Sequence, residues 1–156
     1  MIVSDASPLI VLPKTNNLSI LKKLYGKIVI PKAVKKEITA KENEKAIFNK
    51  IEWIEVRTIK NTGVFALLEK LVDKGEAEAI VLAQELKTTL LVDDAKARKH
   101  AKLLNINIIG TLGLLKMAKN RGLISSAKEV ITDMLSKGYF IEDELINLLL
   151  KDLGER

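Results

Sequence analysis

Short apolar runs recur along the first 122 residues, and a segment with helical spacing follows each of them. The runs are expected to be strands, and they lie at residues 1–4, 27–30, 53–59, 89–93 and 106–109. Strands that alternate with helices form a largely parallel sheet, which helices cover on both faces. The predicted fold class is therefore α/β, with three layers in the order α/β/α and a central, mainly parallel sheet.

The helices of this part are expected at residues 7–12, 18–24, 31–39, 42–49, 64–72, 76–86, 95–104 and 112–120. After Gly122 the pattern changes to two consecutive helices without a strand between them. Ser126 to Glu129 has the capping-box pattern for the start of the first helix, which ends at Gly138, and the second helix covers residues 142–153. We therefore divide the chain into an α/β domain at 1–122 and a C-terminal helical extension at 123–156, packed on the same domain.

The composition limits where this protein works. The chain has no cysteine, which excludes disulfides and cysteine-based zinc sites and suits a reducing cytosol. None of its apolar runs approaches the roughly 20 residues that a helix needs to cross a bilayer. We therefore expect a cytoplasmic protein that has no membrane partner.

The formal net charge of +6 is concentrated in two blocks. Residues 6–36 contain seven lysines and no acid, and residues 95–128 contain eight lysines or arginines and no acid. Each block starts directly after an aspartate, at Asp5 and at Asp94. Such blocks attract a polyanion, although a solvated basic surface would have the same composition.

Acidic residues stand where two predicted strands end, at Asp5 and at Asp93 with Asp94. Because the carboxyl ends of parallel strands form the usual site of such sheets, these side chains are expected at one edge. Glu37 and Glu76 lie on the helices expected to flank that edge. Carboxylates that converge from separate segments repel one another unless a cation joins them. Oxygen ligands without cysteine favour Mg²⁺ or Mn²⁺ over zinc.

Each of these acids except Asp5 also has a purely local explanation. Asp93 or Asp94 would serve as the N-cap of the next helix, and Glu76 would complement the dipole of its helix. Glu37 and Asp94 would each form an i,i+4 ion pair with a basic residue. Asp5 ends an apolar strand in a long stretch without other acids, and nothing local needs its charge. The joint pattern, rather than any single acid, points to function.

Four motifs follow one another along the chain: DAS at residues 5–7, PKAVKKEI at 31–38, GEAEAIVLA at 75–83 and LLVDDAKARK at 90–99. Their order and spacing resemble the PIN-domain family, most closely a prokaryotic, VapC-type subgroup that carries GEAEAI and LLVDD together. The resemblance covers about residues 1–122. It implies a PIN-like nuclease domain in which four acids bind one or two divalent ions and RNA phosphodiester bonds are hydrolysed.

The resemblance also assigns roles to individual residues. It places the catalytic and metal-binding acids at Asp5, Glu37, Glu76 and Asp94, with Mg²⁺ or Mn²⁺ as cofactor. Ser7 matches the small polar residue that follows the first aspartate by two positions in the family. Asp93 lacks a counterpart in most of the family, and it either orients a ligand or caps a helix. The residues expected to contact RNA are Lys96, Arg98, Lys99 and Thr111.

The resemblance implies a metal-dependent endoribonuclease that acts as the toxin of a VapBC-like toxin–antitoxin pair, with a small antitoxin protein as partner. The alternative is a catalytically weak or inactive PIN-like module that binds RNA or protein. A phosphotransfer domain is rejected, because Ser4 and Ser7 stand where its additional acids would be needed.

The last predicted helix has more apolar surface than packing on one side requires. Its apolar residues occupy more than one face, and they are Leu145, Ile146, Leu148, Leu149, Leu150 and Leu153. Packing within the chain would cover part of this surface. We expect the remainder to form a homodimer contact or an antitoxin-binding surface.

Overall fold

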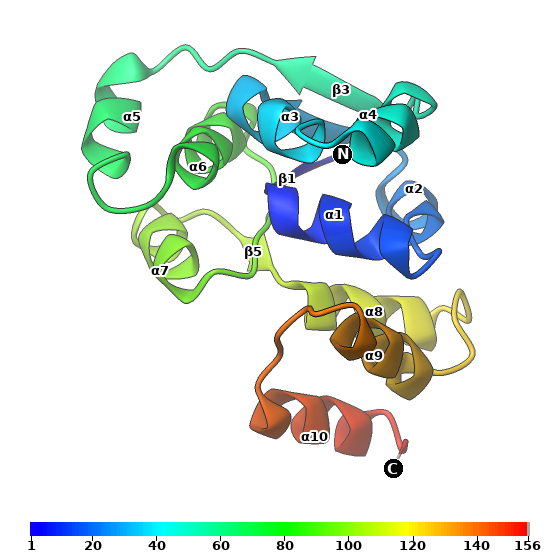
Figure 1. Ribbon diagram of the computed structural model, residues 1–156. Coiled ribbons are helices and arrows are strands. Elements are labelled where there is room, and N and C mark those ends of the chain that lie inside the picture. The colour runs from blue at the N-terminus through cyan, green and yellow to red at the C-terminus, as the bar shows by residue number, and fades with distance from the viewer. Residues whose placement is uncertain (156) are drawn as a thin grey trace.

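The computed structural model describes residues 1–155 and contains a five-stranded sheet flanked by helices (Figure 1). The strands lie in the order β3-β2-β1-β4-β5, and all four pairings are parallel. Their bounds are β1 Ile2–Ser4, β2 Ile28–Pro31, β3 Ile54–Arg57, β4 Leu90–Leu91 and β5 Ile108–Ile109. The predicted α/β/α fold with a parallel central sheet is confirmed.

The helices lie close to where the sequence predicts them. Their bounds are α1 Ala6–Lys14, α2 Ser19–Tyr25, α3 Lys32–Ile38, α4 Glu42–Asn49, α5 Thr62–Leu68, α6 Lys74–Leu86, α7 Ala95–Leu103, α8 Thr111–Asn120, α9 Ala127–Ser136 and α10 Asp143–Asp152. One boundary needs correction, since Pro31 was expected to open α3. It is instead the last residue of β2, paired with Arg57 of β3, and α3 begins at Lys32. Proline suits a strand end because its missing N–H is not needed there.

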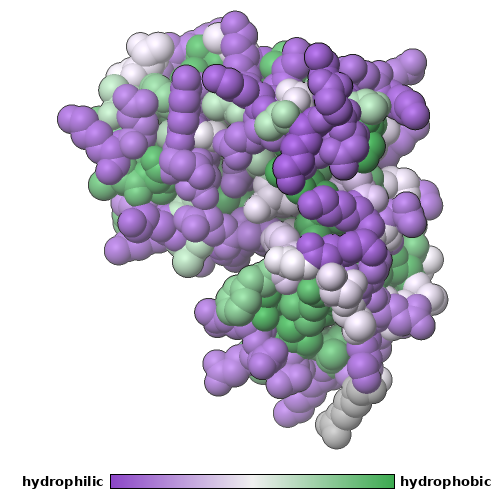
Figure 2. Space-filling view, in the orientation of Figure 1, coloured by the Kyte–Doolittle hydropathy of each residue, from purple (hydrophilic) through white to green (hydrophobic). Residues whose placement is uncertain are grey.

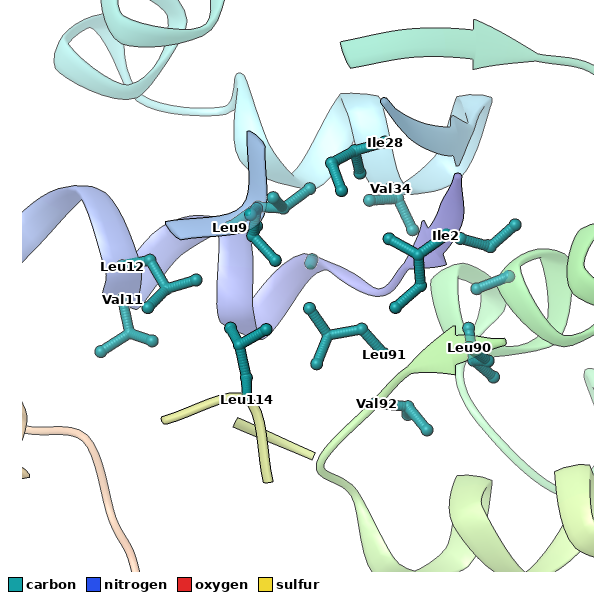
Figure 3. Close-up of a cluster of buried hydrophobic side chains, with 14 of the residues drawn as sticks. Ile2, Leu9, Val11, Leu12, Ile28, Val34, Leu90, Leu91, Val92 and Leu114 are labelled. Carbon is teal, nitrogen blue, oxygen red and sulfur yellow. The ribbon is translucent and has the colours of Figure 1, made fainter. Parts of the chain in front are cut away.

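The core lies on and around the central strands. Figure 3 shows side chains of three strands together with side chains of the helices that cover them: Ile2, Ile28, Leu90, Leu91, Leu9, Leu12, Val34 and Leu114. Ile2 and Val3 of β1 are completely buried, as are Leu90 and Leu91 of β4. This burial holds β1 beside β4, so that the residues following these two strands emerge at the same edge of the sheet.

The C-terminal helices α9 and α10 pack against α8, on one side of the sheet domain (Figure 1). Ser126 caps α9, as predicted, by accepting a hydrogen bond from the N–H of Glu129 at 3.1 Å. The Glu155 carboxylate adds a second cap, because it accepts hydrogen bonds from the N–H groups of Ala127 and Lys128. The end of the described chain is therefore tied to the start of α9. The proposed division of the chain near residue 122 stays a prediction.

No helix within residues 1–155 has both the length and the apolar character that crossing a membrane requires.

Candidate active site

Asp5 lies at the carboxyl end of β1, directly before α1. Its backbone N–H donates to the carbonyl of Leu91 at 2.9 Å, so that the residue is held against the end of β4. It occupies the N-cap position of α1, yet its side chain accepts no capping hydrogen bond. Only 7% of its surface is exposed. A capping role, which would explain an aspartate at this position without any function, is therefore not the role of Asp5.

The pKa of Asp5 is raised to about 7, and the main cause is burial. The N–H of Ala6 works in the opposite direction, while the charges of Asp73, Glu37 and Asp93 raise the pKa further. These three acids come from three separate segments of the chain. Negative charges from several segments therefore act on the carboxylate at the end of β1, and Glu37 is the one among them that the motif pattern places in the metal-binding set.

Glu76 and Asp73 form a reciprocal capping box at the start of α6. The Glu76 N–H donates to Asp73 Oδ1 at 2.8 Å, and the Asp73 N–H donates to Glu76 Oε1 at 3.1 Å. Glu76 is buried, and its pKa is raised to about 7 by burial, with further repulsion from Asp73, Asp5 and Asp94. Asp73 was missed by the sequence prediction, although the D-x-x-E pattern of residues 73–76 signals a capping box.

Glu37 reaches the same place from α3. A Cβ atom built at Gly75 of α6 would overlap Glu37 Oε1, and the same atom would lie 3.6 Å from Asp73 Oδ1. Gly75 therefore leaves the space that the Glu37 carboxylate occupies beside the start of α6. Burial, and then the charge of Asp73, raises the pKa of Glu37.

The neighbouring aspartates after β4 have different partners. Asp94 is exposed and caps α7, with its Oδ2 accepting a hydrogen bond from the Ala97 N–H at 2.9 Å. Asp93 points to the next helix instead, where it accepts hydrogen bonds from the Thr111 N–H at 2.7 Å and the Thr111 hydroxyl at 2.6 Å. The hydroxyl of Tyr139, from the C-terminal extension, also donates to Asp93. Burial and the nearby Asp93 charge raise the pKa of Tyr139.

These contacts define Asp93 as a cap of α8 that also fastens the C-terminal extension to the end of β4. A Cβ atom at Gly110 would lie 3.0 Å from Asp93 Oδ1 and 2.8 Å from Arg98 Nη1, so a glycine is needed where both side chains approach the helix. Of the two aspartates considered as the N-cap of α7, Asp94 has that role, whereas Asp93 binds the first N–H of α8.

A family profile described as PIN domain matches residues 1–155. The chain belongs to the PIN-domain family. The match extends through α9 and α10 and so is longer than the motif resemblance, which ends near Gly122. Membership places the chain among nuclease-like modules, a class whose members usually bind divalent metal.

One solved structure similar to this PIN domain is a PilT N-terminus domain protein from the hyperthermophilic archaeon Sulfolobus solfataricus P2. The two sequences are 21% identical, the match covers 75% of this chain and 92% of the other, and the TM-score is 0.47. No curated protein matches the chain.

The remaining predicted residues of the PIN domain lie around the acidic site. Ser7 is exposed in the first turn of α1, and Lys96 and Lys99 are exposed on α7. Arg98 is partly buried, and its Nη1 donates to the Val92 carbonyl at 2.9 Å. Thr111 needs correction as an RNA contact, because it is only 1% exposed and its hydroxyl is bound to Asp93.

The donor set suits a hard divalent cation, since it consists of carboxylate oxygens, and three of these carboxyl groups, Asp5, Glu37 and Glu76, have raised pKa values. Within residues 1–155, however, no three acidic or histidine side chains are already arranged to share one ion. The physical reason is that Asp73, Glu76 and Asp94 are each turned onto a backbone N–H. Binding an ion with these residues would require their side chains to turn away from those hydrogen bonds.

Proposed function

We propose that this PIN domain is an endoribonuclease that hydrolyses RNA phosphodiester bonds and depends on Mg²⁺ or Mn²⁺. The observation that carries the proposal is Asp5, a buried carboxylate at a strand end without a capping role. Carboxylates from three other segments raise its pKa, and the cluster therefore favours either a bound proton or a bound cation. A divalent cation would offset this repulsion.

The residues that would hold the ion are Asp5, Glu37, Glu76 and Asp94, with Asp73 as a further acid of the same cluster. When bound, the ion lowers the pKa of water and screens negative charge on the attacked phosphate. Asp93 would support the arrangement by fixing the end of β4 against α8 and Tyr139. Ser7, in the first turn of α1, faces solvent and is available to a bound substrate.

Lys96, Arg98 and Lys99 would hold the RNA backbone beside the acids. All three lie on α7, the helix that Asp94 caps, and the first and third are exposed. Cationic side chains that contact phosphates contribute affinity without reading the sequence. Thr111 is left out of this set because of its burial.

The proposal is tested by titrating Mg²⁺ and Mn²⁺ into metal-free protein in the presence of structured and unstructured RNA. Two results together support the proposal: cleavage appears only when the ion is present, and across a chromatographic separation it appears only in the fractions that contain the protein. Intact RNA at every ion concentration would refute it.

A Gly75→Ala variant is expected to lose activity while keeping its fold. The added Cβ displaces the Glu37 carboxylate, and loss of such a supporting position typically costs about 10- to 100-fold in metal affinity or activity. Stability should change little, because the flexible Glu37 side chain can move and alanine is favoured over glycine in helices by about 1 kcal/mol. Cleavage rates and urea unfolding are measured together.

Gly63→Ala is the matched control for this variant, since its Cβ would lie 3.6 Å from Asn61 Oδ1, an ordinary contact. Equal cleavage by the Gly75→Ala and Gly63→Ala variants would exclude Glu37 from the active site.

We infer that the biological role is that of the toxin in a VapBC-like toxin–antitoxin pair in the cytoplasm, with a small antitoxin protein as partner. The motifs GEAEAI and LLVDD support this role. A small reading frame beside the gene, whose product binds the protein and blocks RNA cleavage, is the expected finding.

A catalytically weak module that binds RNA or protein is the second candidate. It is favoured by the hydrogen bonds that hold the carboxylates of Asp73, Glu76 and Asp94 on backbone N–H groups, because these carboxylates are then not free to share one ion. RNA binding that persists at all ion concentrations without any cleavage would select this function over the first.

We further propose that α10 contributes to a homodimer or to the antitoxin-binding surface. The helix buries Ile146, Leu149 and Leu150 against its own chain, but Leu148 stays 65% exposed. A Leu148→Gln variant should therefore lose dimerisation or partner binding, while its unfolding free energy changes by less than about 0.5 kcal/mol. Light scattering and partner titration measure both properties.

Leu67→Gln is a suitable control for this prediction, because Leu67 lies on α5 and is equally exposed at 66%. An unchanged mass and partner affinity for the Leu148→Gln variant would rule out this face of α10 as a contact surface.

A further inference from the structure

Phe140 stands out among the large hydrophobic residues, because 83% of its surface is exposed. It follows Tyr139, whose hydroxyl donates to Asp93 at the edge of the acidic site. The Tyr139 N–H also donates to the carbonyl of Met134, at the end of α9. One side-chain bond and one backbone bond therefore anchor Tyr139, the residue directly before Phe140.

A hollow lies between this segment and α7, and we name it the Phe140 groove. Its lining includes Phe140 and Leu145 of the C-terminal extension. It also includes Arg98, Lys99 and Lys102 of α7, and Asp93 at the end of β4. Figure 2 shows apolar surface over the C-terminal helices and hydrophilic surface over the part of the molecule that contains α7. The groove thus combines an aromatic ring, apolar side chains and three cationic side chains, and Asp93 is part of its lining.

The charges of the groove favour an anionic occupant. Its acidic lining residues are Asp93 and Glu142. Both oxygens of Asp93 already accept hydrogen bonds, from Thr111 and from Tyr139. Lys99 and Lys102, in contrast, are exposed, and neither forms an ion pair with an acid within residues 1–155.

The groove offers a peptide strand little to pair with. The neighbouring edge strand β5 consists of Ile108 and Ile109, and an added strand would gain few backbone hydrogen bonds from two residues. A single nucleic-acid strand needs no such edge. Its backbone requires cations, and its bases require apolar or aromatic surfaces on which to stack.

We propose that the Phe140 groove binds a single-stranded segment of the RNA substrate, with a base stacked on Phe140 and phosphates held by Lys99 and Lys102. The proposal rests on the proposed ribonuclease function and adds to it a binding site formed by the C-terminal extension and α7. Bases of a duplex are already stacked and paired, so they are not free to lie on Phe140, and the groove should select unpaired RNA.

The test measures equilibrium binding of a labelled single-stranded RNA and of its duplex, in chelator so that no cleavage occurs. The Phe140→Ala variant should bind the single strand about ten-fold more weakly, the usual effect of losing one stacked base. Its duplex affinity should stay within about two-fold. The Lys102→Gln variant should reduce the dependence of log affinity on log salt by about one, whereas Lys45→Gln on α4 should leave it unchanged.

A Phe140→Trp variant should restore single-strand binding and give a direct signal, because stacking of a base on the indole quenches its fluorescence. The wild-type chain, whose single tryptophan is Trp53, provides the background. Leu67→Ala controls for the loss of an exposed apolar side chain elsewhere. Circular dichroism establishes that each variant is folded.

Single-strand affinity that is unchanged in Phe140→Ala would overturn the proposal. So would a Phe140→Ala variant whose mass in solution falls while its RNA affinity holds, because the groove would then be a protein interface. Cleavage with Mg²⁺ or Mn²⁺ is scored separately. A wild-type protein that never cleaves but binds single strands through Phe140 would refute the nuclease function and leave the groove assignment intact.

Discussion

Replacement of Asp5 by asparagine is expected to abolish metal-dependent RNA cleavage, with a loss of at least about 100-fold. The substitution keeps the shape of the side chain and removes one charge from the cluster that would bind the ion. Asp5 is the most buried of these acids, and its side chain accepts no capping hydrogen bond that the substitution would remove. The expected loss of cleavage is therefore due to the loss of its charge. Single-turnover cleavage at saturating Mg²⁺ measures the effect.

The fold should survive this substitution, and above about pH 7, where the Asp5 carboxylate is charged, the metal-free variant should be more stable than the wild type. Asparagine removes the repulsion from Asp73, Glu37 and Asp93 that accompanies the buried charge. Asp152→Asn is the matched control, since Asp152 forms only a surface ion pair with Lys116 and should not affect cleavage. Cleavage at the wild-type rate by Asp5→Asn would remove the basis of the proposed function.

The second large effect concerns pH. Metal-free protein is expected to be less stable at pH 8 than at pH 5, by on the order of 2 to 4 kcal/mol. The pKa values of Asp5 and Glu76 are both raised to about 7, from ordinary values of 3.8 and 4.5. Between the ordinary and the raised values the folded protein binds more protons than the unfolded chain. Its unfolding free energy therefore falls as the pH rises through this range, and it levels off above about pH 7.

The surface acids with lowered pKa values do not contribute to the change in unfolding free energy between pH 5 and pH 8. The pKa values of Glu55 and Asp152 are lowered by ion pairs, so the stability they contribute is lost only at lower pH. Saturating Mg²⁺ should restore the stability lost at pH 8, because an ion that binds only the folded state favours folding. In the Asp5→Asn variant, the unfolding free energy of the metal-free protein should fall less between pH 5 and pH 8 than in the wild type, because Asp5 then no longer contributes.

Urea unfolding at several pH values, with chelator and with Mg²⁺, provides the measurement. An unfolding free energy that rises from pH 5 to pH 8 in chelator would contradict the crowding of buried carboxylates at this site. A Mg²⁺ effect of equal size in wild type and in Asp5→Asn would show that the ion acts elsewhere.

The sequence by itself determined the succession of strands and helices and the two strand ends that carry aspartates. Hydrophobic periodicity, caps and glycine stops act over a few residues, so the pattern around Asp5 and Asp94 predicted their positions without knowledge of distant segments. The parallel sheet followed from the alternation of elements. Strand lengths were overestimated, because β4 and β5 consist of only two residues each.

Only the tertiary structure decided which acid does what. Asp93 and Asp94 are adjacent in the sequence, yet one caps α7 locally and the other reaches Thr111 and Tyr139, which are 18 and 46 residues away. The room for Glu37 beside Gly75 likewise depends on how α3 packs against α6. Phe140 acquired its place beside the basic side chains of α7 through the packing of the C-terminal extension. Contacts of this kind depend on how whole helices and strands are placed relative to one another. The packing of their apolar faces determines that placement, and the local sequence does not encode it.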